Sequence, residues 1–192
     1  MDDRLYKTLK YVAIVLTLSW VGWAFYDSFL HDVGPGQRAF QAGERAFADG
    51  EYASALQDYD EALHANHDLL PAVRGRARSL MQLGRLDESL AAFDRAIAAK
   101  PEFAASYANR GIVYDRMGDY QAALADYEHA LKLDPKLADG PNWLTRFLRL
   151  QPDKPPTIAD RARYLRAELA KPPGKRVLRM PEIDAKQRPY KQ

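Results

Sequence analysis

The sequence predicts an all-α protein with an N-terminal transmembrane helix, then an α-solenoid of three helix pairs, then C-terminal capping helices. Two observations predict this fold class. Residues 11–26 carry no charge, and such a run approaches the roughly 20 helical residues that span the apolar core of a bilayer. A motif at Gly50 returns at Gly84 and Gly118, 34 residues apart each time, and a fixed period of this size is typical of stacked helical repeats.

The predicted transmembrane anchor comprises residues 11–30, behind a short flank at residues 1–10. The side chain of Lys10 can extend toward water at one end. Trp20 and Trp23 lie near the other end, as aromatic residues do at a membrane–water interface. Basic residues precede the segment and acidic residues follow it. By the positive-inside rule, we expect a single-pass protein with a cytoplasmic N-terminus and a translocated C-terminal domain, periplasmic if the protein is bacterial.

Two alternatives to an anchor remain open for this segment. Gly22, Trp23 and Ala24 form a small-x-small pattern, which would suit the cleavage site of a signal peptide. The segment could also be a buried helix of a soluble protein. We favour the anchor because apolar and aromatic residues continue past the small-x-small pattern. A hinge at residues 31–36 then leads into the repeats.

Each repeat carries the same special residues in the same order. A glycine ends the first helix, where a left-handed residue is needed, and a small residue lets the second helix approach closely. An aromatic residue fills the space between neighbouring helix pairs, and an alanine follows it three residues later. Pro101 and Pro135 end the second helix of two repeats. The recurring sets are Gly50, Ala55, Tyr59 and Ala62; Gly84, Ser89, Phe93 and Ala96; and Gly118, Ala123, Tyr127 and Ala130, in repeats that span residues 36–69, 70–103 and 104–137.

This pattern resembles the tetratricopeptide repeat (TPR) family over residues 36–137. The third repeat, SYANRGIVYDRMGDYQAALADYEHALKLDP, matches the family pattern most fully. The resemblance implies a right-handed superhelix in which the first helix of each pair lines a concave groove. A single repeat cannot bury its apolar face alone, so the end of the stack needs a cap.

Residues 138–151 are predicted to supply this cap as a helix. Four apolar side chains form a stripe that can cover the third repeat, and the alternative is an apolar face for a partner. The stripe consists of Trp143, Leu144, Phe147 and Leu148. Residues 152–171 are then read as a proline-rich break followed by a basic helix.

Residues 172–192 are predicted to form a basic, extended tail, because prolines are frequent in them and basic residues outnumber acidic ones. Four fates are open to such a segment. It could remain solvated, contact a partner, lie on anionic lipid or fold back into the groove.

The sequence offers no catalytic constellation, and we expect no enzyme activity, no cofactor and no metal. Cysteine is absent, which excludes disulfides, thiolate catalysis and zinc–cysteine sites. His64 and His67 lie three residues apart, but no third ligand is near, so a solvated pair is the better interpretation. The net charge is only +2, which gives no reason to expect nucleic acid as a partner.

The groove therefore carries the functional hypothesis. Arg74 and Arg78 lie one helical turn apart and share a face, and arginine can bind a carboxylate with two hydrogen bonds. We predict that the groove binds an extended or helical peptide with acidic and apolar residues; the alternative is that the arginines are only solvated on an open face. The resemblance assigns to the groove Phe40, Glu44 and Phe47 from the first repeat, Arg74, Arg78 and Met81 from the second, and Asn109, Ile112, Asp115 and Arg116 from the third.

The resemblance implies a membrane-tethered protein–protein interaction scaffold or assembly factor, whose partners are subunits of a membrane or envelope complex. Two alternatives remain: a targeting or import-type receptor with cytosolic repeats, and a stable accessory subunit of a membrane complex. Co-chaperones of this family that clamp a C-terminal carboxylate use Lys, Asn and Arg at five positions. This subtype is not expected, because a single polar match remains among the corresponding residues Phe40, Glu44, Gly75, Ala105 and Asn109.

Overall fold

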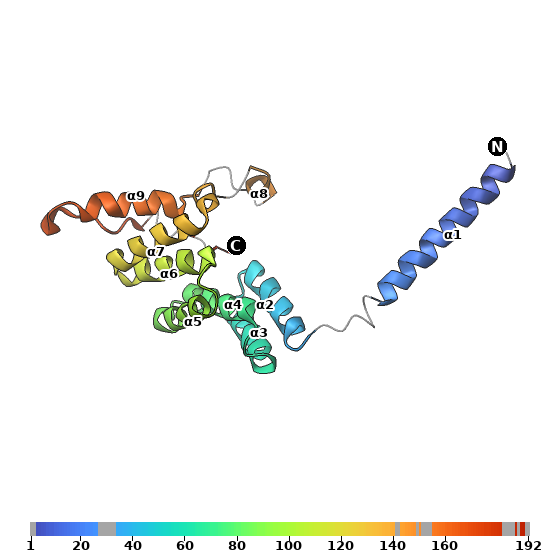
Figure 1. Cartoon of the computed structure of the whole chain (residues 1–192), viewed down its shortest axis with the longest axis horizontal. Helices are drawn as coiled ribbons and strands as arrows, with labels where there is room; N and C mark the ends of the chain where they lie inside the picture. Colours follow the sequence, from blue (N-terminus) through green and yellow to red (C-terminus); the bar gives the residue numbers. More distant parts are fainter. Residues whose placement is uncertain are drawn as a thin grey trace. The chain divides into compact units, whose positions relative to one another are not determined.

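In the part of the chain that the computed structural model describes, all regular secondary structure is helical and there is no strand. The chain divides into two units, Met1–Pro35 and Gly36–Gln192 (Figure 1). The described residues are 3–26, 34–140, 143–148, 150, 155–181, 187, 189 and 190.

The first unit contains a single described helix, α1 (Asp3–Phe25). Its segment Arg4–Phe25 has 22 residues, and an 18-residue window within it has a mean hydropathy of 1.4 and no buried part. By length and composition this helix can cross a membrane, although a signal sequence near an N-terminus has the same properties. The hydroxyls of Thr8 and Thr17 each donate to a carbonyl four residues earlier, at 2.9 Å, so these polar groups need no partner outside the helix. Residues 27–30 of the predicted anchor lie outside the described part.

Six helices of similar length form the repeats of the second unit. Each helix packs against the next, and the first helices α2, α4 and α6 also contact one another in order, so the pairs stack along one direction (Figure 1). The helices are α2 (Gln37–Asp49), α3 (Tyr52–Ala65), α4 (Leu70–Gln82), α5 (Leu86–Ala99), α6 (Ala104–Met117) and α7 (Tyr120–Leu133).

The repeated glycines lie at the turns between paired helices. Gly50, Gly84 and Gly118 have φ angles of 84°, 77° and 88°. This left-handed conformation is unfavourable for residues with a Cβ atom. A single glycine in each repeat therefore specifies the turn between the first helix and the second helix.

The repeated aromatic residues fill the core between helix pairs. Tyr59, Phe93 and Tyr127 are fully buried. The ring of Tyr59 lies so close to α2 and α4 that a Cβ atom added at Gly43 or Gly75 would come within 2.9 Å or 2.4 Å of it. Small residues at these positions therefore allow the neighbouring helices to pack around one large ring.

The end of the stack is covered by α9 (Ile158–Leu169), which packs against α7 and against the 3-10 helix η2 (Pro135–Ala138). The buried side chains of Ile158, Ala162 and Leu165 face the stack. A capping box between Thr157 and Asp160 begins this helix and satisfies N–H groups of its first turn.

This arrangement corrects the prediction that residues 138–151 supply the cap. Helix α8 (Trp143–Leu148) has only six residues, and its Trp143 and Phe147 side chains are 71% and 69% exposed. A helix of this length presents too short an apolar stripe to cover α7, whereas α9 presents a stripe three turns long. The side chains of Leu144 and Leu148 lie outside the described part.

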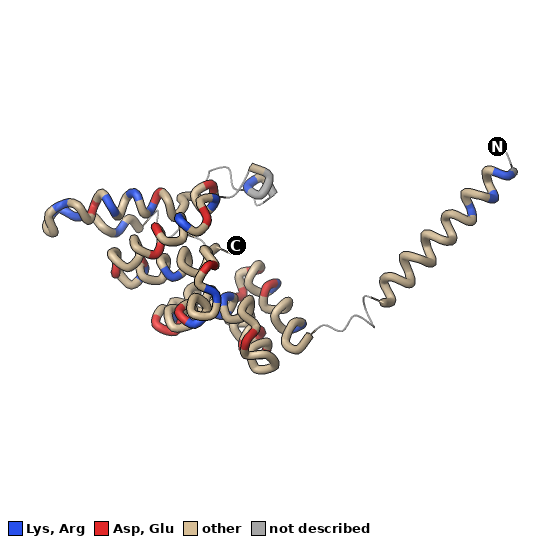
Figure 2. The backbone as a smooth tube through the Cα atoms, viewed as in Figure 1, with Lys and Arg blue, Asp and Glu red and all other residues tan. Residues whose placement is uncertain are grey.

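After α9 the chain turns through the 3-10 helix η3 (Pro173–Lys175) and returns along α9. The Tyr164 hydroxyl donates to the carbonyl of Val177 at 2.6 Å, and the Val177 N–H donates to the Glu168 carboxylate at 2.9 Å. Val177, just after η3, is therefore fixed to the cap. Figure 2 shows that basic residues are frequent along both α9 and this returning segment.

Candidate binding groove

The residues that the resemblance assigns to a groove lie on α2, α4 and α6. We call the surface that these three helices share, together with the residues packed on it, the inner surface. It has two differently built ends, one over the first and second repeats and one over the third repeat.

At the first end, Glu44 on α2 lies between two donors. Its carboxylate accepts a hydrogen bond from the Tyr59 hydroxyl at 2.6 Å and another from Arg78 Nη2 at 2.6 Å. Burial and the Glu44 carboxylate together raise the pKa of Tyr59, so the hydroxyl stays protonated and donates. The guanidinium of Arg78 also lies over the Phe47 ring, 4.9 Å from its centroid. Glu44, Arg78 and Phe47 thus form one cluster across the first two repeats.

Arg78 is 5% exposed, yet its Nε and Nη1 atoms have no hydrogen-bond partner among the described residues. Arg74, one turn earlier on α4, lies over the Phe103 ring at 4.0 Å, and its Nη1 atom is also buried without a partner. Burial and the neighbouring Arg78 lower the pKa of Arg74. The two guanidiniums therefore present unsatisfied donors and excess positive charge at this end.

The middle of the inner surface is largely used for packing. Arg116 donates through Nη1 to the Met81 carbonyl at 2.8 Å, which ties α6 to α4, and burial lowers the pKa of Arg116. The side chains of Met81 and Ile112 are buried in the core. In this structure these two predicted groove residues form the floor beneath the surface and offer almost no area to a ligand.

At the third repeat, Asn109 holds the main chain of Tyr190. Its Nδ2 donates to the Tyr190 carbonyl at 2.8 Å, and its Oδ1 accepts from the Tyr190 N–H at 2.7 Å. The Tyr190 hydroxyl accepts from the N–H of Ile158 at 3.1 Å. Burial raises the pKa of this tyrosine. Tyr190 is therefore bound against α6 and the start of α9.

Asp115 is the centre of a buried polar network at the same end. Arg161 on α9 donates to both of its carboxylate oxygens at 2.7 Å, and the two side chains are only 1% and 4% exposed. The Tyr127 hydroxyl donates to it at 3.2 Å and Gln187 at 3.3 Å. Burial, followed by the charge of Asp115, raises the pKa of Tyr127. Both oxygens of the Asp115 carboxylate thus accept hydrogen bonds from other residues of this chain.

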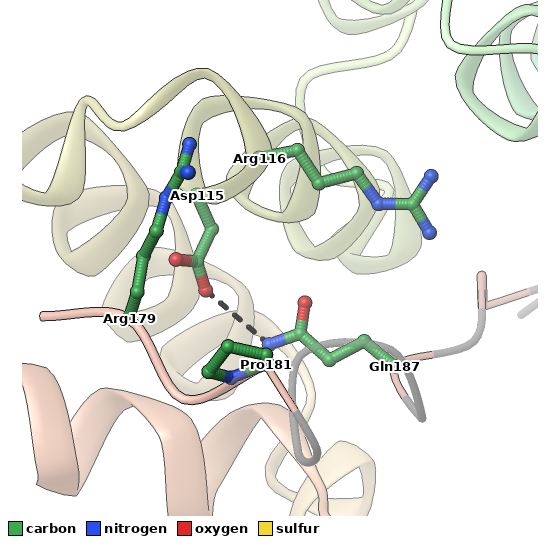
Figure 3. A pocket seen from close by; sticks show the side chains of 5 residues that line it. All are labelled: Asp115, Arg116, Arg179, Pro181 and Gln187. Atoms are coloured by element: carbon green, nitrogen blue, oxygen red, sulfur yellow. Dashed lines mark hydrogen bonds between the residues drawn. The ribbon is translucent and has the colours of Figure 1, made fainter.

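A small cavity lies beside this network, with a volume of about 240 Å³. Figure 3 shows Gln187 reaching Asp115 from the returning chain, with Pro181 and Arg179 beside them and Arg116 at the border. The cavity is therefore formed jointly by α6 and the C-terminal residues.

Sequence reasoning missed four residues that build this surface: Phe103, Arg161, Gln187 and Tyr190. A weak signal existed for Tyr190, the last aromatic residue in a segment otherwise rich in basic and polar residues. No local pattern connects it with Asn109, which lies 81 residues earlier. Among the described residues, no group of three or more histidine or acidic side chains is arranged to hold a metal.

Comparison with known proteins supports the same repeat. Tetratricopeptide repeat models match residues 77–118 and 104–137, and no curated protein matches the sequence. These matches, together with the stacked pairs, support tetratricopeptide repeats within residues 77–137, the part of the chain that the models match.

Several solved structures, two of them TPR domains, resemble the chain. The first TPR domain of Spaghetti (RPAP3), bound to an HSP90 peptide, has a TM-score of 0.57 at 19% identity, and the match covers 71% of this chain and 94% of that one. The TPR domain of OM64 from Arabidopsis has a TM-score of 0.52 at 20% identity, covering 61% and 93%. MamA has a TM-score of 0.52 at 20% identity, covering 60% and 68%. At these identities the likeness shows the fold, an all-α TPR-like solenoid.

Proposed function

We propose that this protein is a membrane-tethered scaffold or assembly factor that binds partner polypeptides on its inner surface. The observation that supports this most directly is the pair of arginines, Arg74 and Arg78, whose buried donors have no hydrogen-bond partner within the described part of the chain. TPR domains generally act as scaffolds rather than enzymes. The Spaghetti domain is bound to a peptide, which supports peptide binding as the class of function.

The two arginines favour an acidic partner. A buried donor without an acceptor destabilises a protein by about 1–3 kcal/mol, and Glu44 accepts from only one nitrogen of Arg78. A ligand carboxylate placed beside the half-buried Arg74 would supply an acceptor for that guanidinium. It would also bring negative charge close to Arg78, whose own side chain is almost fully buried. This charge would offset the two effects that lower the pKa of Arg74, which are burial and then repulsion from Arg78.

Aromatic rings beside the arginines favour apolar side chains in the same partner. The guanidiniums of Arg74 and Arg78 lie over the rings of Phe103 and Phe47, respectively. The Phe40 ring lies 6.1 Å from the Tyr59 ring, measured between centroids. The proposed ligand is therefore a peptide in which acidic and apolar residues alternate. Carboxylate-clamp co-chaperones use basic and amide side chains at the positions of Phe40 and Glu44. The HSP90 peptide is therefore not the ligand proposed for this protein.

A labelled synthetic peptide of alternating glutamate and leucine tests this proposal. We expect the full-length protein in detergent to bind it, and Arg74→Glu to weaken binding roughly tenfold or more through loss of a charge-assisted hydrogen bond. Fluorescence anisotropy measures the affinity. The matched control is Arg45→Glu, because Arg45 is an exposed arginine on α2 and should leave binding unchanged.

A second peptide, with lysine in place of glutamate, controls for apolar adhesion. Equal binding of the two peptides by the wild-type protein, or equal affinity of the wild type and the Arg74→Glu variant, would contradict the proposed ligand. Circular dichroism of each variant must first show the wild-type helix content.

A further inference from the structure

The third-repeat end of the inner surface already holds two C-terminal residues that lie outside any helix, Gln187 and Tyr190. We propose that Asn109, Asp115 and the first turn of α9 form a binding site for an extended polypeptide, and that the C-terminal segment occupies this site in cis. The C-terminal segment is defined here by its described residues, 176–181, 187, 189 and 190.

The contact between Asn109 and Tyr190 is made to the main chain. One amide side chain pairs with both the N–H and the carbonyl of a single residue, at 2.7 and 2.8 Å, as a neighbouring β-strand would. Such pairing requires an extended residue but selects no side chain. The same amide can therefore bind another extended chain once Tyr190 has left.

Side chains add two further contacts. The Tyr190 hydroxyl accepts from the Ile158 N–H, one of the free donors at the start of α9, and its ring packs against the main core cluster. Gln187 donates to the Asp115 carboxylate. These contacts lie on two different helices, so the segment is seated in a formed site.

Leu178, only 12 residues before Tyr190, is also held by a side chain of the cap. Arg161 donates to the Leu178 carbonyl at 2.9 Å, in addition to its bonds with Asp115, so one guanidinium joins α6, α9 and the returning segment. A ligand on such a short tether has an effective concentration in the millimolar range or above. A peptide added in trans therefore competes with a high local concentration of the tethered segment.

The segment and the proposed acidic partner meet different ends of the inner surface. The segment lies over the third repeat, whereas Arg74 and Arg78 lie on α4. A partner long enough to contact both ends of the inner surface would have to displace Tyr190 from Asn109. This displacement rests on the proposed function. The contact between Tyr190 and Asn109 within the chain does not depend on the proposed function.

The test uses a fluorescent synthetic peptide of residues 176–192 added to the full-length protein in detergent. We expect weak binding to the wild type, because its own segment fills the site. Tyr190→Ala in the protein should strengthen binding of the added peptide at least about tenfold, by weakening the tethered competitor. Adding Asn109→Ala to that variant should abolish the gain. Equal affinity of the wild type and the Tyr190→Ala variant would overturn the proposal.

Hydrogen exchange provides a second readout within the intact protein. The Tyr190 amide should exchange slowly in the wild type and lose that protection in Asn109→Ala, while Gln121→Ala, an exposed amide on α7, should leave it protected. Unchanged protection in Asn109→Ala, with wild-type helix content, would also overturn the proposal. Arg74→Glu should not alter Tyr190 exchange, so a failure of the acidic-peptide proposal remains distinguishable from a failure of this one.

Discussion

Single tyrosines on the second helices determine much of the local structure. The Tyr59 ring requires glycine at two facing positions, and its hydroxyl provides a donor for Glu44. Tyr127 repeats this role with Gly111 and Asp115. The same residue thus fixes how closely helices approach and orients a carboxylate on the inner surface.

Gly75→Ala is expected to destabilise the repeat domain. The new Cβ atom would come within 2.4 Å of the Tyr59 ring, and overpacking of a well-filled core typically reduces stability by about 1–3 kcal/mol. Thermal unfolding followed by circular dichroism measures the effect. Gly174→Ala serves as the control, because no atom lies within 4 Å of its added Cβ. Equal melting temperatures of the two variants would show that Tyr59 can move aside.

At the scale of secondary-structure elements, the cap depends on one buried ion pair. Helix α9 contributes apolar side chains to the stack, but the Arg161–Asp115 pair also joins it to α6 through two bonds of 2.7 Å. Removing one partner of a buried pair leaves an uncompensated charge, which is more harmful than removing both.

Arg161→Met is therefore expected to destabilise the protein by about 3–5 kcal/mol, with α9 losing order first. The double variant Arg161→Met/Asp115→Asn should recover part of this loss, because the isolated carboxylate is gone. Denaturant unfolding of the wild type, both single variants and the double variant gives the coupling energy. Strictly additive effects would indicate that the pair contributes no specific interaction. Arg163→Met, an exposed arginine on the same helix, is the control.

At the scale of the whole molecule, the repeat unit is separated in sequence from a helix whose apolar side chains are exposed. Leu16, Leu18 and Trp20 are among the large apolar side chains that α1 leaves uncovered. A helix that is apolar on all sides requires an apolar environment. We propose that this environment is a bilayer, with the repeats on the translocated side.

A reporter that is active only after translocation, fused after Gln192, tests this topology. We expect activity on the translocated side and protein in the membrane fraction, with an intact mass that still includes α1. A reporter active only in the cytosol would favour the import-type receptor. A mass that lacks the first helix would favour a signal peptide. Adding arginines after residue 30 should reduce translocation, since basic flanking residues determine orientation.

The amino-acid sequence by itself determined the helices of the repeats and their order. Its signals there are local: glycine where a left-handed turn is needed, a small residue facing a large ring, and a period of 34 residues. It also pointed to Arg74 and Arg78, because one helical turn places them on the same face. Each of these inferences depends on residues that are close in the chain.

Only the tertiary structure decided which segment caps the stack and what occupies the third-repeat end of the inner surface. The sequence interpretation chose residues 138–151 for the cap, but the structure uses α9. The sequence left four alternatives open for residues 172–192. The structure places Tyr190, which belongs to that segment, against Asn109. Such contacts join residues far apart in sequence, and their formation depends on how the intervening chain turns. The sequence shows no pattern that predicts the contact with Asn109. Hydrogen bonds to the main chain require no particular side chain in the segment that is bound.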